Sequence, residues 1–318
     1  MNHPGRYLLV LSVLVALGFA AALMLGSTFR SPADVVQGLM QHDFDIWQYR
    51  MPRAILAVLV GAALALSGTI IQGIIHNPLA SPDILSINHG ASLAAVLTMM
   101  LIPSASVWAL PVAACVGAGV AFLVLLLVAG RGAGPLQTAL IGVALSAFYA
   151  AISDYLMLTH PLEVNTAMVW LTGSLWGRTW SFVEMGAPLL IVLLPLALVF
   201  SKSFDLLTLG ENKAATLGVN VGRDRILLLA LAVMLAAVAV AISGPIAFLG
   251  LVAPHLARKL VGGRHRVLLP ASILTGALIL QISDIAVRSI KPPLELPAGI
   301  FTALIGAPYF FYLLRRSL

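Results

Sequence analysis

A series of apolar runs, most of them close to 20 residues long, constrains this chain more than any other feature. At 1.5 Å per residue, about 20 helical residues cross the roughly 30 Å of hydrocarbon in a membrane. The chain is 60% hydrophobic and only 9% charged, which excludes a soluble globular domain. The sequence therefore predicts an all-α, polytopic membrane protein, in which residues 1–318 form a single transmembrane domain. The runs lie near residues 7–26, 54–75, 85–102, 105–129, 136–158, 183–201, 226–242, 268–287 and 296–314.

Residues 243–257 are also apolar, but they are short and interrupted by Gly and Pro. Charge decides whether they cross the membrane. Arg223 and Arg225 precede the run at 226–242, and Arg258 and Lys259 follow residue 257. Because Lys and Arg concentrate on the cytoplasmic side, two crossings should separate these groups. The prediction is about ten membrane-spanning helices, with both termini in the cytoplasm.

A weak internal repeat is present. Ser67 and Gly68 are followed by Pro78, and Ser243 and Gly244 are followed by Pro254, with the same Ser-to-Pro spacing. In the ten-helix arrangement the two copies run in opposite senses. Two related halves of inverted topology are common in transporters, so the repeat favours that arrangement here.

Residues 202–225 form the longest polar segment, and the charge argument makes it a cytoplasmic loop. Within it, residues 211–217 should form a short helix, because Gly210 precedes it and Gly218 can end it. An ordinary solvated loop is the simpler interpretation. However, the face expected to be exposed is small and apolar, which favours a partner surface. That face consists of Ala214, Ala215 and Leu217.

Enzymatic and metal-binding functions find no support. The chain has no nucleotide-binding loop and no Cys/His pair at zinc spacing, and its single cysteine, Cys115, excludes an internal disulfide. No catalytic residue, metal ligand or cofactor is therefore expected in this chain. Asp154 and Asp284 lie near span ends and are candidates for ion coupling. Arg288, one turn after Asp284, favours a structural ion pair instead.

Four segments resemble the permease family of type II ABC importers, which import iron-siderophore complexes, cobalamin and haem. The segments are 50–91, 209–225, 243–270 and 295–314. The resemblance extends over nearly the whole chain and is weakest over 1–45 and 159–182. Within the family, the motifs are most similar to those of permeases for ferric citrate.

The resemblance implies a location in the bacterial inner membrane and a dimer of permeases with the pathway along its two-fold axis. It also implies two cytoplasmic ATPase subunits, which would bind ATP-Mg, and a soluble periplasmic substrate-binding protein. The similarity to ferric citrate permeases implies a related second permease chain. It also implies that iron(III) dicitrate is carried from periplasm to cytoplasm.

The resemblance implies three sets of functional residues. The set that couples to the ATPases is Leu209, Gly210, Glu211, Ala214, Ala215, Leu217 and Gly218. The cytoplasmic gate is Asn77, Leu79, Gly134 and Pro135, where Pro135 departs from the Ser or Thr frequent in the family. The residues that dock the binding protein are Arg50, Arg53 and, less securely aligned, Arg288.

Physical arguments bear on these roles. Pro78 has no backbone donor and disfavours a helical Asn77, so the freed backbone must face protein or a wet cavity. Arg50 and Arg53 lie on the predicted outer side, where they would either anchor the span at lipid headgroups or meet an acidic partner. An ion-coupled secondary transporter using Asp154 and Asp284 is the alternative function, and it leaves the 210–218 helix without a role.

Overall fold

A computed structural model describes residues 4–102, 104, 106, 108–130, 133–208, 210–218, 220–290 and 295–317. These residues form helices and connecting segments, with no strand among them. The helices are α1 (Pro4–Met24), α2 (Pro32–Met40), η1 (Phe44–Arg50), α3 (Met51–Ile75), η2 (Pro82–Leu85), α4 (Ile87–Leu101), α5 (Ala109–Ala129), α6 (Pro135–Thr159), α7 (Val164–Leu171), α8 (Trp180–Val199), α9 (Ser201–Leu207), α10 (Glu211–Thr216), α11 (Val221–Ser243), α12 (Leu249–Val261), α13 (His265–Ile290) and α14 (Ala298–Ser317).

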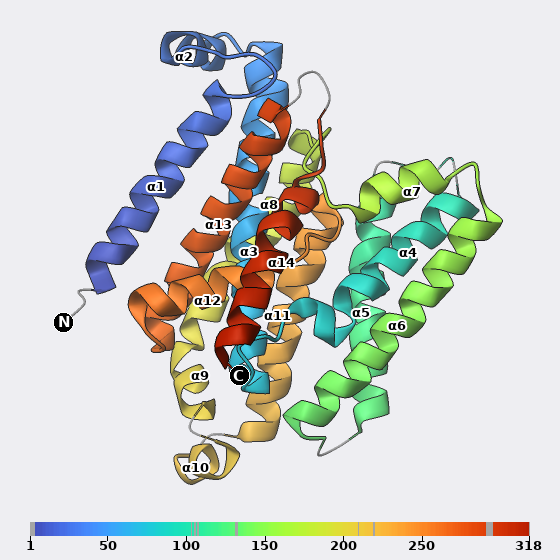
Figure 1. The fold of residues 1–318 in the computed structure, drawn as a ribbon, viewed down its shortest axis with the longest axis vertical. Coiled ribbons are helices and arrows are strands. Elements are labelled where there is room, and N and C mark those ends of the chain that lie inside the picture. Colours follow the sequence, from blue (N-terminus) through green and yellow to red (C-terminus); the bar gives the residue numbers. More distant parts are fainter. Residues whose placement is uncertain are drawn as a thin grey trace.

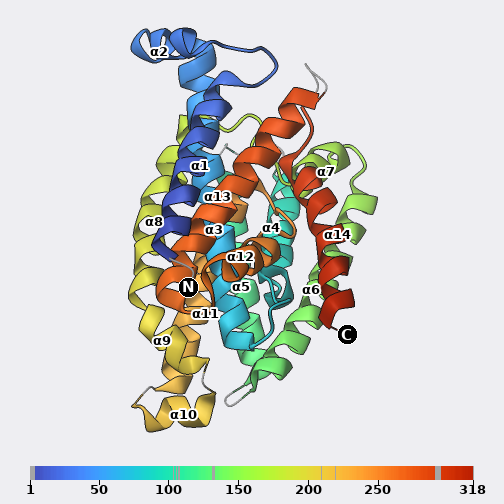
Figure 2. The same cartoon turned by 60° about the vertical axis from the view of Figure 1, so that its left-hand side comes forward.

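The long helices run roughly along one direction, and short helices project at the two ends (Figure 1 and Figure 2). Helix α2 marks one end, called the α2 end below, and α10 marks the other, called the α10 end. Both chain termini lie in the half of the molecule nearer the α10 end (Figure 1). An even number of crossings between the termini agrees with this placement.

The ten predicted spans all correspond to helices, but they differ in length. Seven helices are long and apolar enough to cross a membrane, with η1 and α3 forming one of them. The other three predicted spans correspond to α4, with 15 residues, α12, with 13, and α14, whose apolar part is Ala298–Tyr312. Helix α12 is about 20 Å long at 1.5 Å per residue, less than the thickness of the hydrocarbon.

Helix α3 lies at the centre of the fold, and most of its 25 residues are buried. It packs against α11, α12 and α13. Its glycines permit close approach: a Cβ at Gly68 would overlap the carbonyl oxygen of Gly250 in α12, and a Cβ at Gly61 would overlap that of Gly276 in α13. Small residues at helix contacts are typical of membrane proteins, where dispersion contacts between closely packed helices stabilise the fold.

The fold contains two halves with the same order of elements. A long helix, a connector, a short helix and two long helices occur as α3–α4–α5–α6 and again as α11–α12–α13–α14. Ser86 and Phe248, each in the left-handed conformation, immediately precede the two short helices. Helix α3 begins at the α2 end and α11 at the α10 end, so the halves run in opposite directions (Figure 1).

The serines used to detect the repeat are not structurally equivalent. Ser67 lies within α3, whereas Ser243 is the last residue of α11. The halves correspond in a different register, because the connector before the short helix is longer in the first half.

The predicted loop at 202–225 is mostly helical. It contains most of α9, all of α10 and the first residues of α11, which begins at Val221 rather than near residue 226. The side chain of Asn220 accepts a hydrogen bond from the amide of Arg223 and caps the helix. Charged residues in this first turn lie beyond the apolar part of α11, so hydropathy alone places the helix start too late.

Candidate functional site

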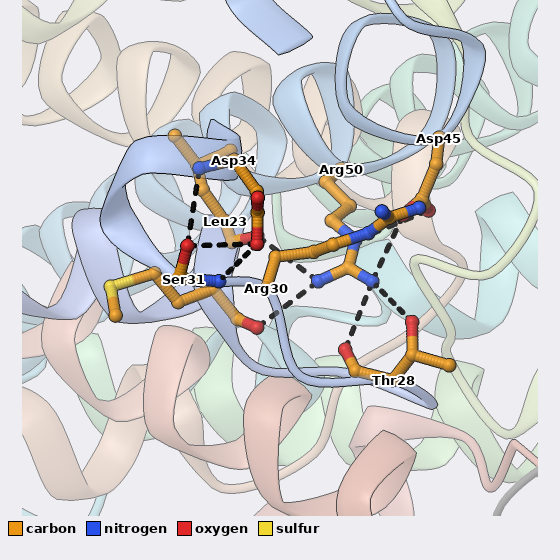
Figure 3. A network of polar contacts seen from close by, with 8 residues as sticks. Leu23, Thr28, Arg30, Ser31, Asp34, Asp45 and Arg50 are labelled. Atoms are coloured by element: carbon orange, nitrogen blue, oxygen red, sulfur yellow. Dashed lines mark hydrogen bonds and ion pairs between the residues drawn. The ribbon is translucent and has the colours of Figure 1, made fainter. Parts of the chain in front are cut away.

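Arg50 is buried at the α2 end, with a relative exposure of 4%. Its guanidinium donates to the carbonyl oxygens of Leu23, Met24 and Thr28 and to the Thr28 hydroxyl. Its Nη2 lies 3.0 Å from Oδ2 of Asp45 (Figure 3). Arg50 therefore fastens the end of α1 and the following segment to η1.

Arg53 and Arg288 meet at one carboxylate, that of Asp284. The distance from Nη2 of Arg53 to Oδ1 of Asp284 is 2.9 Å, and that from Nε of Arg288 to Oδ2 is 3.6 Å. Arg53 also pairs with Glu295, and Arg288 donates to the carbonyl oxygen of Ala22 at 2.6 Å. The structural ion pair that the sequence predicts between Asp284 and Arg288 is confirmed.

The structure corrects one assumption about the three arginines predicted to dock a partner, namely their exposure. All three side chains are buried: the relative exposure is 4% for Arg50, 7% for Arg53 and 4% for Arg288. Their charges are taken up by Asp45, Asp284, Glu295 and backbone carbonyls. Sequence places these arginines at span ends. It does not reveal that Arg50 and Arg288 contact α1 or the segment after it, or that Arg53 is held by Asp284 and Glu295. Contact with a binding protein stays a prediction for all three.

Arg178 is different, because no carboxylate lies within ion-pair distance of it among the described residues. It lies between α7 and α8, and its guanidinium carbon is 4.4 Å from the centre of the Phe182 ring. Its Nε atom is buried without a hydrogen-bond partner. Burial lowers the pKa of Arg178 to about 10, so the side chain remains positively charged at neutral pH.

Arg178 lines two adjacent cavities near the α2 end. The larger has a volume of about 630 Å³, and its wall includes Asn165, Thr166 and Trp170 of α7. The smaller, of about 160 Å³, is bordered by Arg50, Arg53 and Arg288. Both cavities are bordered by Trp176, Gly177, Arg178 and Glu295, so they are adjacent, and we call the pair the Arg178 recess.

A separate cavity of about 270 Å³, which we call the Asp83 cavity, lies between the two halves, where α4 and α6 face the connector before α12. Asp83, His89 and Asp154 line it. The side chain of Asp83 accepts hydrogen bonds from Asn88 and from the Ser81 hydroxyl. Asp83 is not among the site residues that the sequence predicts, although it lies within the segment 50–91 that carries the family resemblance. A signal was available in the acid that follows Pro82 between two apolar runs.

The predicted gate residues lie in two turns. Asn77 follows the end of α3, and its side chain accepts a hydrogen bond from the amide of Leu79 at 2.9 Å. Leu79 is half-buried. Gly134 is the N-cap of α6 and Pro135 its first residue, a position that suits proline because no donor is needed there. No hydrogen bond joins the two turns within the described part of the chain, and their role as a gate stays a prediction.

The predicted coupling segment forms α10, a helix of six residues. Gly210 and Gly218 flank it with φ values of 97° and 85°, which favour glycine. Ala215 is exposed and Leu217 is 59% exposed. Ala214, predicted to be exposed with them, is instead fully buried, on a helix that contacts α9 and α11. Leu209 lies outside the described residues, and the side chain of Glu211 is not described.

Helix α10 is linked to the membrane-spanning helices through α9. The carboxylate of Asp205 in α9 accepts hydrogen bonds from the His265 amide at 2.9 Å and from its Nδ1 at 2.8 Å. Asp205 therefore caps the start of α13. The ring of His76, just after α3, contacts the carbonyl oxygen of Leu207 at 3.2 Å. These contacts join α9 to α3 and α13, and α9 in turn contacts α10.

Comparison with known proteins identifies the family. The model of the FecCD transport family matches residues 13–316. The chain belongs to the FecCD transport family. A relative in this family, the Fe(3+) dicitrate transport system permease protein FecD of Escherichia coli (strain K12), is 54% identical over 276 residues, 87% of this chain and 86% of that protein. The Fe(3+)-citrate import system permease protein YfmE of Bacillus subtilis (strain 168) is 46% identical over 99% of this chain and 96% of its own length.

A solved structure agrees with the FecCD assignment. It shows an inward-facing conformation of a protein described as a metal-chelate type ABC transporter, with a TM-score of 0.90 and 32% identity. It covers 98% of this chain and 99% of that one. The family resemblance stated from the motifs is therefore confirmed, and the chain is a permease subunit of this family of membrane transporters.

Proposed function

We propose that this FecCD protein is the membrane-spanning subunit of an ATP-driven importer that carries iron(III) dicitrate from the periplasm to the cytoplasm. The observation that carries the proposal is α10, a short helix with exposed Ala215 and Leu217 at one end of the molecule. An exposed apolar face of this kind suits a groove on a partner. Its links through α9 to α3 and α13 provide a route for movement.

The proposed assembly contains a related second permease, two ATPases and a periplasmic binding protein. ATP-Mg would bind only to the ATPases. The α10 end and both termini would face the cytoplasm of a bacterial inner membrane, and the α2 end would face the periplasm. Closure of the ATPases would push α10, and the spans would alternate between outward and inward openings around the pathway.

In this proposal, Asn77 and Leu79, with the start of α6 at Gly134 and Pro135, form the closure near the cytoplasm. The two turns are the ends of α3 and α6, and α3 is among the helices linked to α10. The binding protein would approach the α2 end. Arg50, Arg53 and Arg288 would act there mainly by bracing the surface that the partner meets, because they are buried.

The alternative, an ion-coupled secondary transporter, loses one of its two acids. Asp284 is 2% exposed and lies between Arg53 and Arg288. Both oxygens of this carboxylate are already engaged by guanidinium groups, so it is not free to bind a transported ion. Asp154 could still bind an ion, since it is exposed and borders the Asp83 cavity.

The test is uptake of radiolabelled iron(III) citrate by proteoliposomes that contain the whole complex. Uptake should require ATP and should persist when an uncoupler is added. Ala215→Glu should abolish uptake while the protein still inserts, because a bulky charge would not fit a groove. Thr216→Ala, an exposed change on the same helix, is the control. Uptake that needs an ion gradient and ignores ATP would establish the alternative.

A further inference from the structure

We propose that the Arg178 recess is a binding site for a polycarboxylate anion, with Arg178 as the residue that holds a carboxylate. The proposal deepens the proposed function, because it assigns to this chain a direct contact with the citrate groups of the chelate.

The charge of Arg178 lacks the compensation that the neighbouring arginines have. Arg50 pairs with Asp45, and Arg53 and Arg288 share Asp284. For Arg178, the described residues supply the ring of Phe182 and no carboxylate. Burying a charged arginine without an acidic partner is unfavourable because the charge loses its hydration free energy. The cation–π contact with an aromatic ring offsets only part of this loss.

The side chain of Arg178 also has unused hydrogen-bonding capacity. Its Nε is buried and makes no hydrogen bond within the described part of the chain. A guanidinium offers five donors in a planar fork that matches two carboxylate oxygens. A carboxylate in the recess would supply both the missing charge and the missing acceptors.

The recess has the size and lining for a small polar anion. Its larger part, about 630 Å³, falls within the roughly 300–1,000 Å³ range of small-molecule sites. Asn165, Thr166 and Ser174 add neutral polar groups to the wall, and Trp170 and Trp176 add flat apolar surface. A citrate group carries several carboxylates and a hydroxyl, so it needs several donors around one cation.

Among the described residues, the Asp83 cavity has acids and no arginine in its wall, whereas the recess has four arginines beside its two acids, Glu295 and Asp45. The acids in the Asp83 cavity are Asp83 and Asp154. A polyanion would therefore be held at the α2 end, where the proposed function places its entry.

The experiment measures citrate binding directly, with no binding protein present. The full chain, with any subunits that remain bound, is placed in lipid nanodiscs and titrated calorimetrically with sodium citrate against matched sodium chloride. The variants are Arg178→Gln, Arg178→Lys and Asn165→Asp, the last of which adds a negative charge to the recess and leaves Arg178 in place. Arg30→Gln is the control, since Arg30 is at the same end, pairs with Asp45 and does not line the recess.

We expect citrate to bind the wild type, Arg178→Gln to weaken it at least tenfold, and Asn165→Asp to weaken it several-fold. Arg178→Lys should retain part of the affinity, and Arg30→Gln all of it. Failure of the wild type to bind citrate at 10 mM, roughly the weakest range of specific ligands, would overturn the proposal. So would sulfate binding as tightly as citrate, or an equal loss in Arg30→Gln.

The two proposals can fail separately. If citrate binding depends on Arg178 but the assembled transporter takes up no iron(III) citrate, the proposed substrate is wrong and the anion site stands. If uptake is normal in wild type and in Arg178→Gln, and citrate does not bind, the site is wrong and the proposed function stands.

Discussion

The buried carboxylate of Asp284 allows a quantitative prediction about stability. It lies between two arginines, 2.9 Å from Arg53 and 3.6 Å from Arg288. Asp284→Asn keeps the shape of the side chain and removes its charge. Arg53 would then keep one acidic partner, Glu295, and Arg288 would lose the carboxylate with which it pairs.

The magnitude follows from the geometry. At an effective dielectric constant of about 20, unit charges attract by roughly 6 kcal/mol at 2.9 Å and roughly 5 kcal/mol at 3.6 Å. The desolvation already incurred by all three groups and the repulsion between the arginines offset much of this. Breaking buried pairs by removing one partner costs about 3–5 kcal/mol, and we expect Asp284→Asn to destabilise the fold by that amount.

The assay is reversible unfolding in mixed micelles of mild detergent and dodecyl sulfate, followed by tryptophan fluorescence. Arg30→Gln is the matched control, because its pair with Asp45 joins side chains that are 40% and 36% exposed. Exposed pairs contribute about 0.2–1 kcal/mol. If Asp284→Asn costs no more than Arg30→Gln, the three charges do not act as a buried network and the reasoning is refuted.

Three further predictions concern other parts of the molecule. Gly68→Val should destabilise the fold by about 1–3 kcal/mol or more, because the added side chain forces α3 away from α12. Gly119→Val should have little effect, because no atom lies near the position of its added Cβ. The yield of monodisperse protein compares the two variants. Leu79→Ala should make reconstituted transporter leak substrate without ATP, because Leu79 is half-buried and its loss removes part of the roughly 2–5 kcal/mol that a fully buried leucine contributes. A leak equal to that of wild type would show that Leu79 is not part of the gate. Hydrogen bonds from the Ser31 side chain and amide lower the pKa of Asp34 below 3.8, so the capping of α2 is present above that pH and lost as pH falls through the lowered pKa. The protection factor of the α2 amides, which is the intrinsic exchange rate divided by the observed rate at the same pH, should fall on acidification in wild type and change little with pH in Asp34→Asn.

The helices were predictable from sequence because a chain that crosses the hydrocarbon must satisfy its backbone hydrogen bonds internally, which restricts it to few structures. Apolar runs and basic flanks located a helix at each of the ten predicted spans, and seven helices in the described part of the chain are long and apolar enough to cross a membrane. Boundaries were less predictable: α11 begins before its apolar residues, since a capped turn can extend into water.

The sites were predictable only in part, because burial of polar residues depends on contacts distant in the sequence. Arg53 pairs with Asp284, which is 231 positions away. Nothing in the sequence around Arg178 indicates that it lacks an acidic partner. By contrast, the flanking glycines were enough to predict α10.

The short length of α12 has a consequence for how the chain is made. A segment of 13 residues with Arg258 and Lys259 in its last turn is too short and too charged to insert into the membrane efficiently on its own. Its contacts are with α3, already synthesised, and with α13, which emerges later. We therefore expect α12 to wait at the membrane surface and to enter the bilayer only when α13 follows, so that biogenesis of this half depends on a helix pair rather than on single helices.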